Sequence, residues 1–352
     1  MRELKILAVV VVLTLITYWG VEPFAHSQMH PAVSNANFNF AEADSQSSKE
    51  NVNKLQIALD DANKALEKAN DTNKSNLEKA VKAAEADLAK AIEFEKTINE
   101  FWASSKEAIE AKGDVANGQI LVTSNCTACH SIESQGFPQI MDNATTAAAY
   151  GVATPDLGSS GKIYTKEFLV GFIKNPALAS KVSHKFEDGK VHPMPGYDWM
   201  SSQEIADMVA YLQSIAPKEM TNKEVFVDSC QRCHGLKYAD MQNGTMSAFT
   251  PDENIKNYMG KLPPDLSQYI ISRGPDYLGK FINDPQKLLE GTAMPRVGLT
   301  QEAQDQVIKY MEEIGASKKA EREELGPKFL IYFVIFAIIA FLWKAKLWRD
   351  VH

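Results

Sequence analysis

The sequence predicts an all-α chain with two tandem helical units, a helical hairpin inserted in front of them and an apolar helix at each end. Three observations support this fold class. Two stretches downstream of residue 150 repeat one another at a constant offset, residues 49–112 contain neither glycine nor proline, and both termini carry long apolar runs. At 352 residues the chain exceeds one compact domain, so we expect at least two.

The composition is ordinary for a globular protein with some membrane content, at 45% hydrophobic and 23% charged residues. The net charge of −8 argues against nucleic acid as a partner. A mild acidic excess instead suits docking to a basic soluble protein.

The N-terminus carries the pattern of an export signal. Basic residues precede an uncharged, mostly apolar run over residues 6–19, which is short for a full membrane span. Ala25-His26-Ser27 is a passable cleavage site, whereas Tyr18 and Trp19 are typical of an anchor at a membrane interface. The predicted segments are a signal anchor or signal peptide at 1–25 and a linker at 26–47.

Residues 48–112 predict a helical hairpin. Apolar positions recur at alternating steps of three and four residues on both sides of a polar break at 70–75. Two helices folded back as an antiparallel pair are the economical interpretation. Small residues in the seam indicate a thin coiled coil, whose role as a spacer, a docking arm or a dimerisation element stays open. The stripe consists of Val52, Leu55, Leu59, Ala62, Leu66 and Ala69, and then of Leu77, Val81, Ala84, Leu88 and Ala91.

Each tandem unit contains one C-x-x-C-H motif, and the two motifs use every cysteine in the chain. Two thiols at this spacing can each form a thioether with a haem vinyl group, while the adjacent imidazole becomes the proximal iron ligand. The motifs therefore predict two covalently attached haem c groups. A zinc site, structural disulfides or a thioredoxin-like pair would not require the two histidines. The motifs are Cys126-Thr-Ala-Cys129-His130 and Cys230-Gln-Arg-Cys233-His234.

A repeat follows each motif and outlines the fold of the two units. Pro-Asp-Leu occurs at 155–157 and at 264–266. The pattern Phe/Tyr-Leu-x-x-Phe-Ile-x-x-Pro then occurs at 168–176 and at 277–285, and predicts a middle helix that ends at proline.

An amphipathic helix closes each copy of the repeat. Ser201 with Glu204 forms a capping box in front of the first closing helix, and Thr300 is an N-cap candidate for the second. A short helix, a loop, a middle helix, a ligand loop and a final helix form the pattern of a class I cytochrome c fold. We expect this fold for residues 113–217 and for residues 218–317.

The loop before each closing helix is expected to supply the sixth iron ligand. In the second unit no histidine follows His234 until the last residue, and Met294 stands at the expected place. The aligned residue in the first unit is Met194, in a longer loop. Alternatives to Met194 are His184, His192 and Met200, whereas Met241, Met246 and Met259 come too early in the second unit.

Histidine and methionine as axial ligands have a consequence for function. A soft thioether sulfur favours the ferrous state, so both centres are expected to be electron carriers of positive potential. A six-coordinate iron also lacks the open position that peroxidase chemistry needs. The predicted axial ligands are His130 and Met194 in the first unit, and His234 and Met294 in the second.

A second apolar run lies near the C-terminus. Residues 329–343 carry no charge, and counted on to Trp348 the run matches a hydrocarbon core of about 30 Å. The basic residues at its end favour a cytoplasmic C-terminus, which places the two preceding units on the far side of the membrane. The predicted segments are a charged stalk at 318–326 and a transmembrane helix at 327–348.

This architecture resembles a known family. The tandem units, the anchor after a charged stalk, and the segment Tyr18-Trp19-Gly-Val-Glu-Pro-Phe-Ala-His26 resemble the two-haem cytochrome c1 subunit of some bacterial quinol–cytochrome c reductases. The resemblance covers about residues 1–32 and 113–352, and the hairpin departs from it. It implies a cytochrome b and a Rieske iron–sulfur protein as partners in the bacterial inner membrane, with the haem units on the periplasmic side. Electrons would pass from the Rieske centre to a periplasmic cytochrome c or a terminal oxidase.

Two other functions remain open. A membrane-tethered di-haem shuttle, or a cytochrome subunit of an oxidase or another respiratory enzyme, would carry the same motifs. A two-haem peroxidase would need a high-spin haem and peroxide turnover. If the chain is the reductase subunit or a membrane-tethered electron carrier, we expect no bond-making active site in it.

Overall fold

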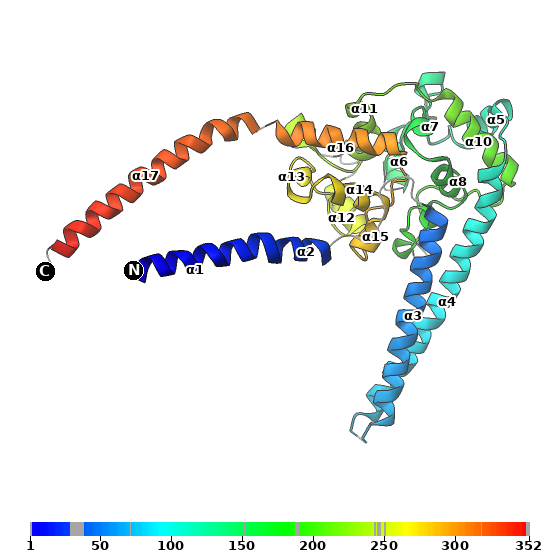
Figure 1. The fold of residues 1–352 in the computed structure, drawn as a ribbon. Helices are drawn as coiled ribbons and strands as arrows, with labels where there is room; N and C mark the ends of the chain where they lie inside the picture. The colour runs from blue at the N-terminus through cyan, green and yellow to red at the C-terminus, as the bar shows by residue number, and fades with distance from the viewer. Residues whose placement is uncertain are drawn as a thin grey trace.

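The computed structural model describes residues 2–28, 39–70, 72–150, 152–186, 190–242, 244, 248–249, 251–317 and 319–349. Within these ranges the repetitive structure is helical, and β-structure is limited to isolated bridges (Figure 1). The predicted all-α fold is therefore confirmed. Residues 29–38 of the predicted linker, as well as Met246, lie outside the described residues.

The helices follow the order that the sequence predicts, with short additional turns in the loops. The N-terminal half contains α1 Arg2–Ile16, α2 Glu22–Gln28, α3 Phe40–Glu67, α4 Lys74–Glu110, α5 Val115–Asn125, α6 Asn143–Tyr150, α7 Ser160–Ile163, α8 Lys166–Lys174 and α9 Pro176–Ala179. The C-terminal half contains α10 Ser202–Ile215, α11 Asn222–Phe226, α12 Asp252–Met259, α13 Tyr269–Arg273, α14 Pro275–Asn283, α15 Pro285–Leu288, α16 Gln301–Ala316 and α17 Lys319–Arg349. Single π-helical turns at Thr17–Val21 and Val227–Gln231 follow α1 and α11.

The predicted antiparallel hairpin is present as α3 and α4, which lie along one another and project from the body (Figure 1). It begins at Phe40, so the prediction of a linker up to residue 47 is wrong. Asn39 caps α3 by accepting a hydrogen bond from the backbone N–H of Glu42 at 3.1 Å. Phe40 is 4% exposed and packs against Trp102 and Phe168, which fixes the start of the helix through tertiary contacts.

The two cytochrome-like units share one plan. In the first unit α5 packs on α10 so closely that a Cβ atom on Gly118 would lie 1.9 Å from the carbonyl oxygen of Asp207. In the second unit α11 and α16 form the corresponding pair. The capping box at Ser201 and the N-cap at Thr300 are both present, as predicted. Each unit therefore closes around its own apolar core.

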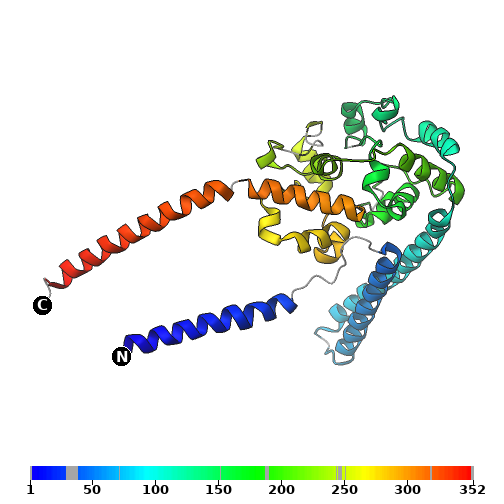
Figure 2. The ribbon, with the colours of Figure 1, turned by 45° about the horizontal axis from the view of Figure 1, so that its top comes forward.

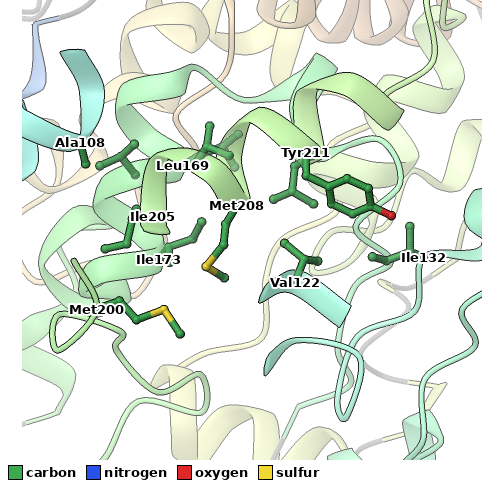
Figure 3. Packing of buried hydrophobic residues seen from close by; sticks show 12 residues of the cluster. Ala108, Val122, Ile132, Leu169, Ile173, Met200, Ile205, Met208 and Tyr211 are labelled. Carbon is green, nitrogen blue, oxygen red and sulfur yellow. The ribbon is translucent and has the colours of Figure 1, made fainter. Parts of the chain in front are cut away.

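Side chains from α4, α5, α8 and α10 meet in the core of the first unit (Figure 3). The base of α4 contributes Ala108, so the hairpin is part of this core and not a separate arm at that end. Other fully buried members of the first core are Val122, Ile132, Val170, Ile205, Met208 and Val209, and those of the second are Val225, Phe226, Leu236, Leu299 and Val307, together with Ile163 from α7 of the first unit.

The units are joined directly to one another. Tyr164 of the first unit and Leu299 of the second form an isolated antiparallel bridge, flanked by backbone hydrogen bonds of 3.0 and 2.9 Å. An ion pair of 2.8 Å links Lys162 to Glu302 beside it. As a result, the ligand loop of the second unit lies against the middle of the first.

The terminal helices extend from the same side of the body in both views (Figures 1 and 2). Two helical segments, one over 5–25 and one ending at Arg349, are long and apolar enough to cross a membrane by length and composition. α17 runs through Pro327, so from residue 319 on the predicted stalk at 318–326 and the predicted membrane helix at 327–348 form one continuous helix. Proline at this position removes one backbone donor without ending the helix.

Candidate haem sites

The first C-x-x-C-H motif follows the C-terminus of α5 and opens into a cavity of about 390 Å³. Cys126, Cys129 and His130 line this cavity together with Met194 from the predicted ligand loop. The rest of the wall is mostly apolar, which suits a porphyrin plane. Part of it comes from the second unit, namely Asp228, Ser229, Arg232, Cys233, Ala293, Pro295, Arg296 and Val297, so the cavity reaches a cysteine of the second motif.

Both motif histidines are oriented by the same kind of hydrogen bond. The Nδ1 atom of His130 lies 2.7 Å from the carbonyl oxygen of Pro155, and that of His234 lies 2.9 Å from the carbonyl oxygen of Pro264. Burial lowers the pKa of both imidazoles, so they are neutral and Nδ1 carries the proton. This leaves Nε2 with a lone pair, which is the form that binds iron.

The repeated Pro-Asp-Leu sequence thus has a physical explanation that the sequence alone did not supply. Its proline carbonyl orients the histidine, and its aspartate fixes the turn that follows the motif. Asp156 accepts a hydrogen bond from the backbone N–H of Glu133 at 2.9 Å, and Asp265 accepts one from that of Lys237 at 2.8 Å. The sequence feature that could have identified this role is the recurrence of the tripeptide after both motifs.

The distal side of the first site presents two of the four candidate ligands. Met194 and His192 line the cavity, whereas His184 and Met200 are not among its described lining residues. Met200 lies instead in the first core near Met208 (Figure 3). The Nδ1 atom of His192 is engaged with the backbone of Met194, at 3.1 Å from its nitrogen and 3.0 Å from its oxygen.

The second site is built from equivalent parts. Met294 and Cys230 both pack against the second core. The loop around Met294 is held by Thr292, whose hydroxyl accepts a hydrogen bond from the Met294 backbone N–H at 3.3 Å. Gln286 donates to the Met294 carbonyl oxygen at 3.4 Å.

The donor set of both sites fits haem c. The cysteines are free and partly buried, and burial raises the pKa of the Cys126 thiol to about 12 and that of Cys230 to about 11. Neutral thiols next to a neutral imidazole suit thioether attachment better than a thiolate metal centre. Among the described residues no three His, Cys, Asp or Glu side chains converge as metal ligands.

An all-α fold with two such sites defines a c-type cytochrome. A family model described as cytochrome c matches residues 115–216 and 221–315, which together make up more than half of the chain. The chain therefore belongs to the cytochrome c family, and its two matched domains bind two covalent haem c groups. Its function is haem-based electron transfer. No curated protein and no solved structure matches the chain.

Two residues between the sites were not singled out from the sequence. Arg232 lies inside the second motif, yet it lines the first cavity and donates a hydrogen bond to the Ala153 carbonyl oxygen of the first unit. Tyr164 lines the same cavity, and burial raises its pKa to about 12, so its phenol is neutral. The C-x-x-C-H pattern leaves its two inner positions open, so no sequence signal marks Arg232 as an inter-unit contact.

We expect Arg232→Gln to lower the midpoint potential of the first haem. The guanidinium acts electrostatically on His130 and His192, and a nearby positive charge favours the reduced centre. Loss of an interaction on the order of 1 kcal/mol corresponds to about 40 mV for one electron. A spectrally resolved redox titration measures the shift. Arg273→Gln, which removes a cation that lies over Tyr277, is the control; equal potentials in both variants would contradict the prediction.

Proposed function

We propose that this chain is the membrane-anchored cytochrome c1-type subunit of a quinol–cytochrome c reductase. It would accept electrons from a Rieske iron–sulfur protein and pass them to a periplasmic cytochrome c or a terminal oxidase. The observation that carries this proposal is the shared wall of the two haem sites. Arg232, Cys233, Ala293 and residues 295–297 of the second unit help to enclose the first site. Such sites suit a relay within one protein better than two independent carriers.

The terminal helices support a membrane role. They leave the body on the same side, so one bilayer can accommodate both (Figures 1 and 2). Basic residues stand at both free ends, near Arg2 and Lys5 and near Lys346 and Arg349. By the positive-inside rule both ends would lie in the cytoplasm and the haem units in the periplasm. In this arrangement the N-terminal segment is a retained anchor.

We infer that Met194 and Met294 are the sixth ligands. When bound, haem supplies reversible one-electron exchange at iron. The chain's own residues would hold it through the four cysteines, keep His130 and His234 neutral and oriented through their proline carbonyls, and exclude water with apolar walls. His192 lines the same cavity and is the alternative at the first site, whereas Met194 is favoured because it aligns with Met294 in the repeat.

Purification from native membranes tests the proposed complex. We expect the full chain, solubilised in mild detergent, to co-purify with a cytochrome b and a Rieske protein, and its haems to be reduced by quinol in a reaction that quinol-site inhibitors block. A di-haem protein that purifies alone and is not reduced by quinol would favour the second candidate, a membrane-tethered shuttle. That candidate is supported by the same anchors and the same closed sites.

We expect Met194→Ala to change the ferric spectrum of the first haem and to lower its potential, because a thioether ligand is lost. His192→Ala should leave the ligation state unchanged, although it removes an aromatic neighbour of Phe172 and Phe186. Absorption spectra and redox titration of both variants compare the two assignments. If Met194→Ala left the spectrum and potential of the first haem unchanged while His192→Ala altered them, His192 would be the sixth ligand in place of Met194.

A further inference from the structure

A cluster of charged side chains is buried where the hairpin meets both cytochrome units. Asp44 of α3 is 3% exposed, Arg296 of the second unit 1% and Asp284 of the second unit 1%. Lys181 of the first unit completes the cluster and is partly buried. Two acidic and two basic groups therefore balance in a region that has little access to water.

Asp44 is the centre of this cluster. Its two carboxylate oxygens accept hydrogen bonds from Arg296, at 3.0 Å from Nη1 and at 2.5 Å from Nη2, in a bidentate pair. The indole Nε1 of Trp102 on α4 donates to the same carboxylate at 3.0 Å, and Lys181 Nζ lies 3.5 Å from it. Burial alone would raise the pKa of Asp44, but Arg296 and Lys181 hold it below its usual range, so the group is charged.

Arg296 stands two residues after Met294, and its contacts fix the backbone of the ligand loop. Its Nε donates to the Asn283 carbonyl oxygen at 3.1 Å, and its backbone N–H donates to the Ser180 carbonyl oxygen at 2.9 Å. The guanidinium also lies over the Phe40 ring, 4.8 Å from its centre. These contacts join Arg296 to the hairpin and to both units, and its side chain is buried between them.

The loop that Arg296 holds separates the two haem sites. Ala293, Pro295 and Val297 face the first cavity, whereas Met294 packs on the second core. A displacement of this loop would move the proposed ligand of one haem and the wall of the other together. The three roles that the sequence left open for the hairpin do not include this one.

We propose that Asp44 is a positioning residue for the second haem: the inserted hairpin uses it to hold the loop at 293–297, and thereby to fix Met294. This inference rests on the proposed ligation by Met294. The hairpin then belongs to the electron-transfer machinery.

The test compares Asp44→Asn with Asp60→Asn in the full chain, purified with both haems. Asp60 lies on the same helix, is exposed and accepts a hydrogen bond from the Gln56 amide one turn earlier, so its substitution is a matched change of charge. We expect Asp44→Asn to shift the potential of the second haem and to convert part of it from thioether ligation, as seen by absorption and paramagnetic resonance. Asp60→Asn should behave as the wild type does.

Trp102→Phe keeps the test decisive if Asp44→Asn fails to accumulate. It removes one hydrogen bond to Asp44 and keeps an aromatic ring, so we expect a smaller shift of the second haem in the same direction. An unchanged second haem in Asp44→Asn, or in Trp102→Phe where only that variant accumulates, would overturn the proposal. An equal change in Asp60→Asn would also overturn it. Met294→Ala separates the two claims: a silent Met294→Ala would reject the ligand and with it the proposal, whereas a responsive Met294→Ala beside a silent Asp44→Asn would reject the positioning role alone.

Discussion

Gly298→Ala is expected to destabilise the protein by about 2–5 kcal/mol, a large part of the stability of an ordinary domain. Gly298 has a φ of +68°, in the left-handed region where a Cβ atom is strained. A Cβ atom there would also lie 2.0 Å from the ring of Phe168. Because Gly298 accepts the backbone hydrogen bond of Thr165, the damage falls on the junction between the two units.

Gly291→Ala separates the two causes of this destabilisation. Gly291 has a φ of +76°, but no atom lies within 4 Å of the position that its Cβ would take. We expect a loss of about 1–2 kcal/mol there, from backbone strain alone. Thermal and denaturant unfolding, followed by circular dichroism and by the haem absorption band, compare the two variants. Equal losses would mean that Phe168 moves aside without cost.

The parts of the fold that depend on local patterns were predictable from the sequence. The hairpin, the tandem units and the capping residues follow from periodicity and from side chains a few residues apart. The predicted start of the hairpin at residue 48 was wrong, because Phe40 is held by Trp102 and Phe168, which lie far away along the chain. The continuity of α17 through Pro327 could not be predicted, because a proline tolerated inside a long helix looks, in sequence, like a helix boundary.

The residues of the candidate sites also fall into two groups, those that local sequence predicts and those that only the structure brings together. The cysteines and histidines of both motifs are adjacent in sequence, so their chemistry could be inferred directly. Contacts between units leave no such trace: Arg232 reaches the first site from the second motif, and Asp44 reaches Arg296 across 252 positions of chain. A single sequence does not pair residues at that separation, so the role of the hairpin depends on the structure.

The haem ligands were inferred by alignment of the two repeats, and Met294 allows the sharper test. We expect Met294→Ala to leave the second haem covalently attached, because Cys230 and Cys233 are unaffected. Its potential should fall by a substantial part of the roughly 0.8 V range over which axial ligands set haem potentials. The ferric spectrum should also lose the signature of thioether ligation, while the first haem keeps its own.

Met241→Ala is the matched control for this prediction. Met241 also packs on the second core, so its truncation removes a similar apolar volume without touching the loop at 293–297. If loss of packing were the cause, both variants would shift the second haem alike. A shift in Met294→Ala alone requires a specific bond to sulfur, because the two side chains share the same core and differ in the loop that carries them. Unchanged spectra and potential in Met294→Ala would show that the second iron takes its sixth ligand from elsewhere.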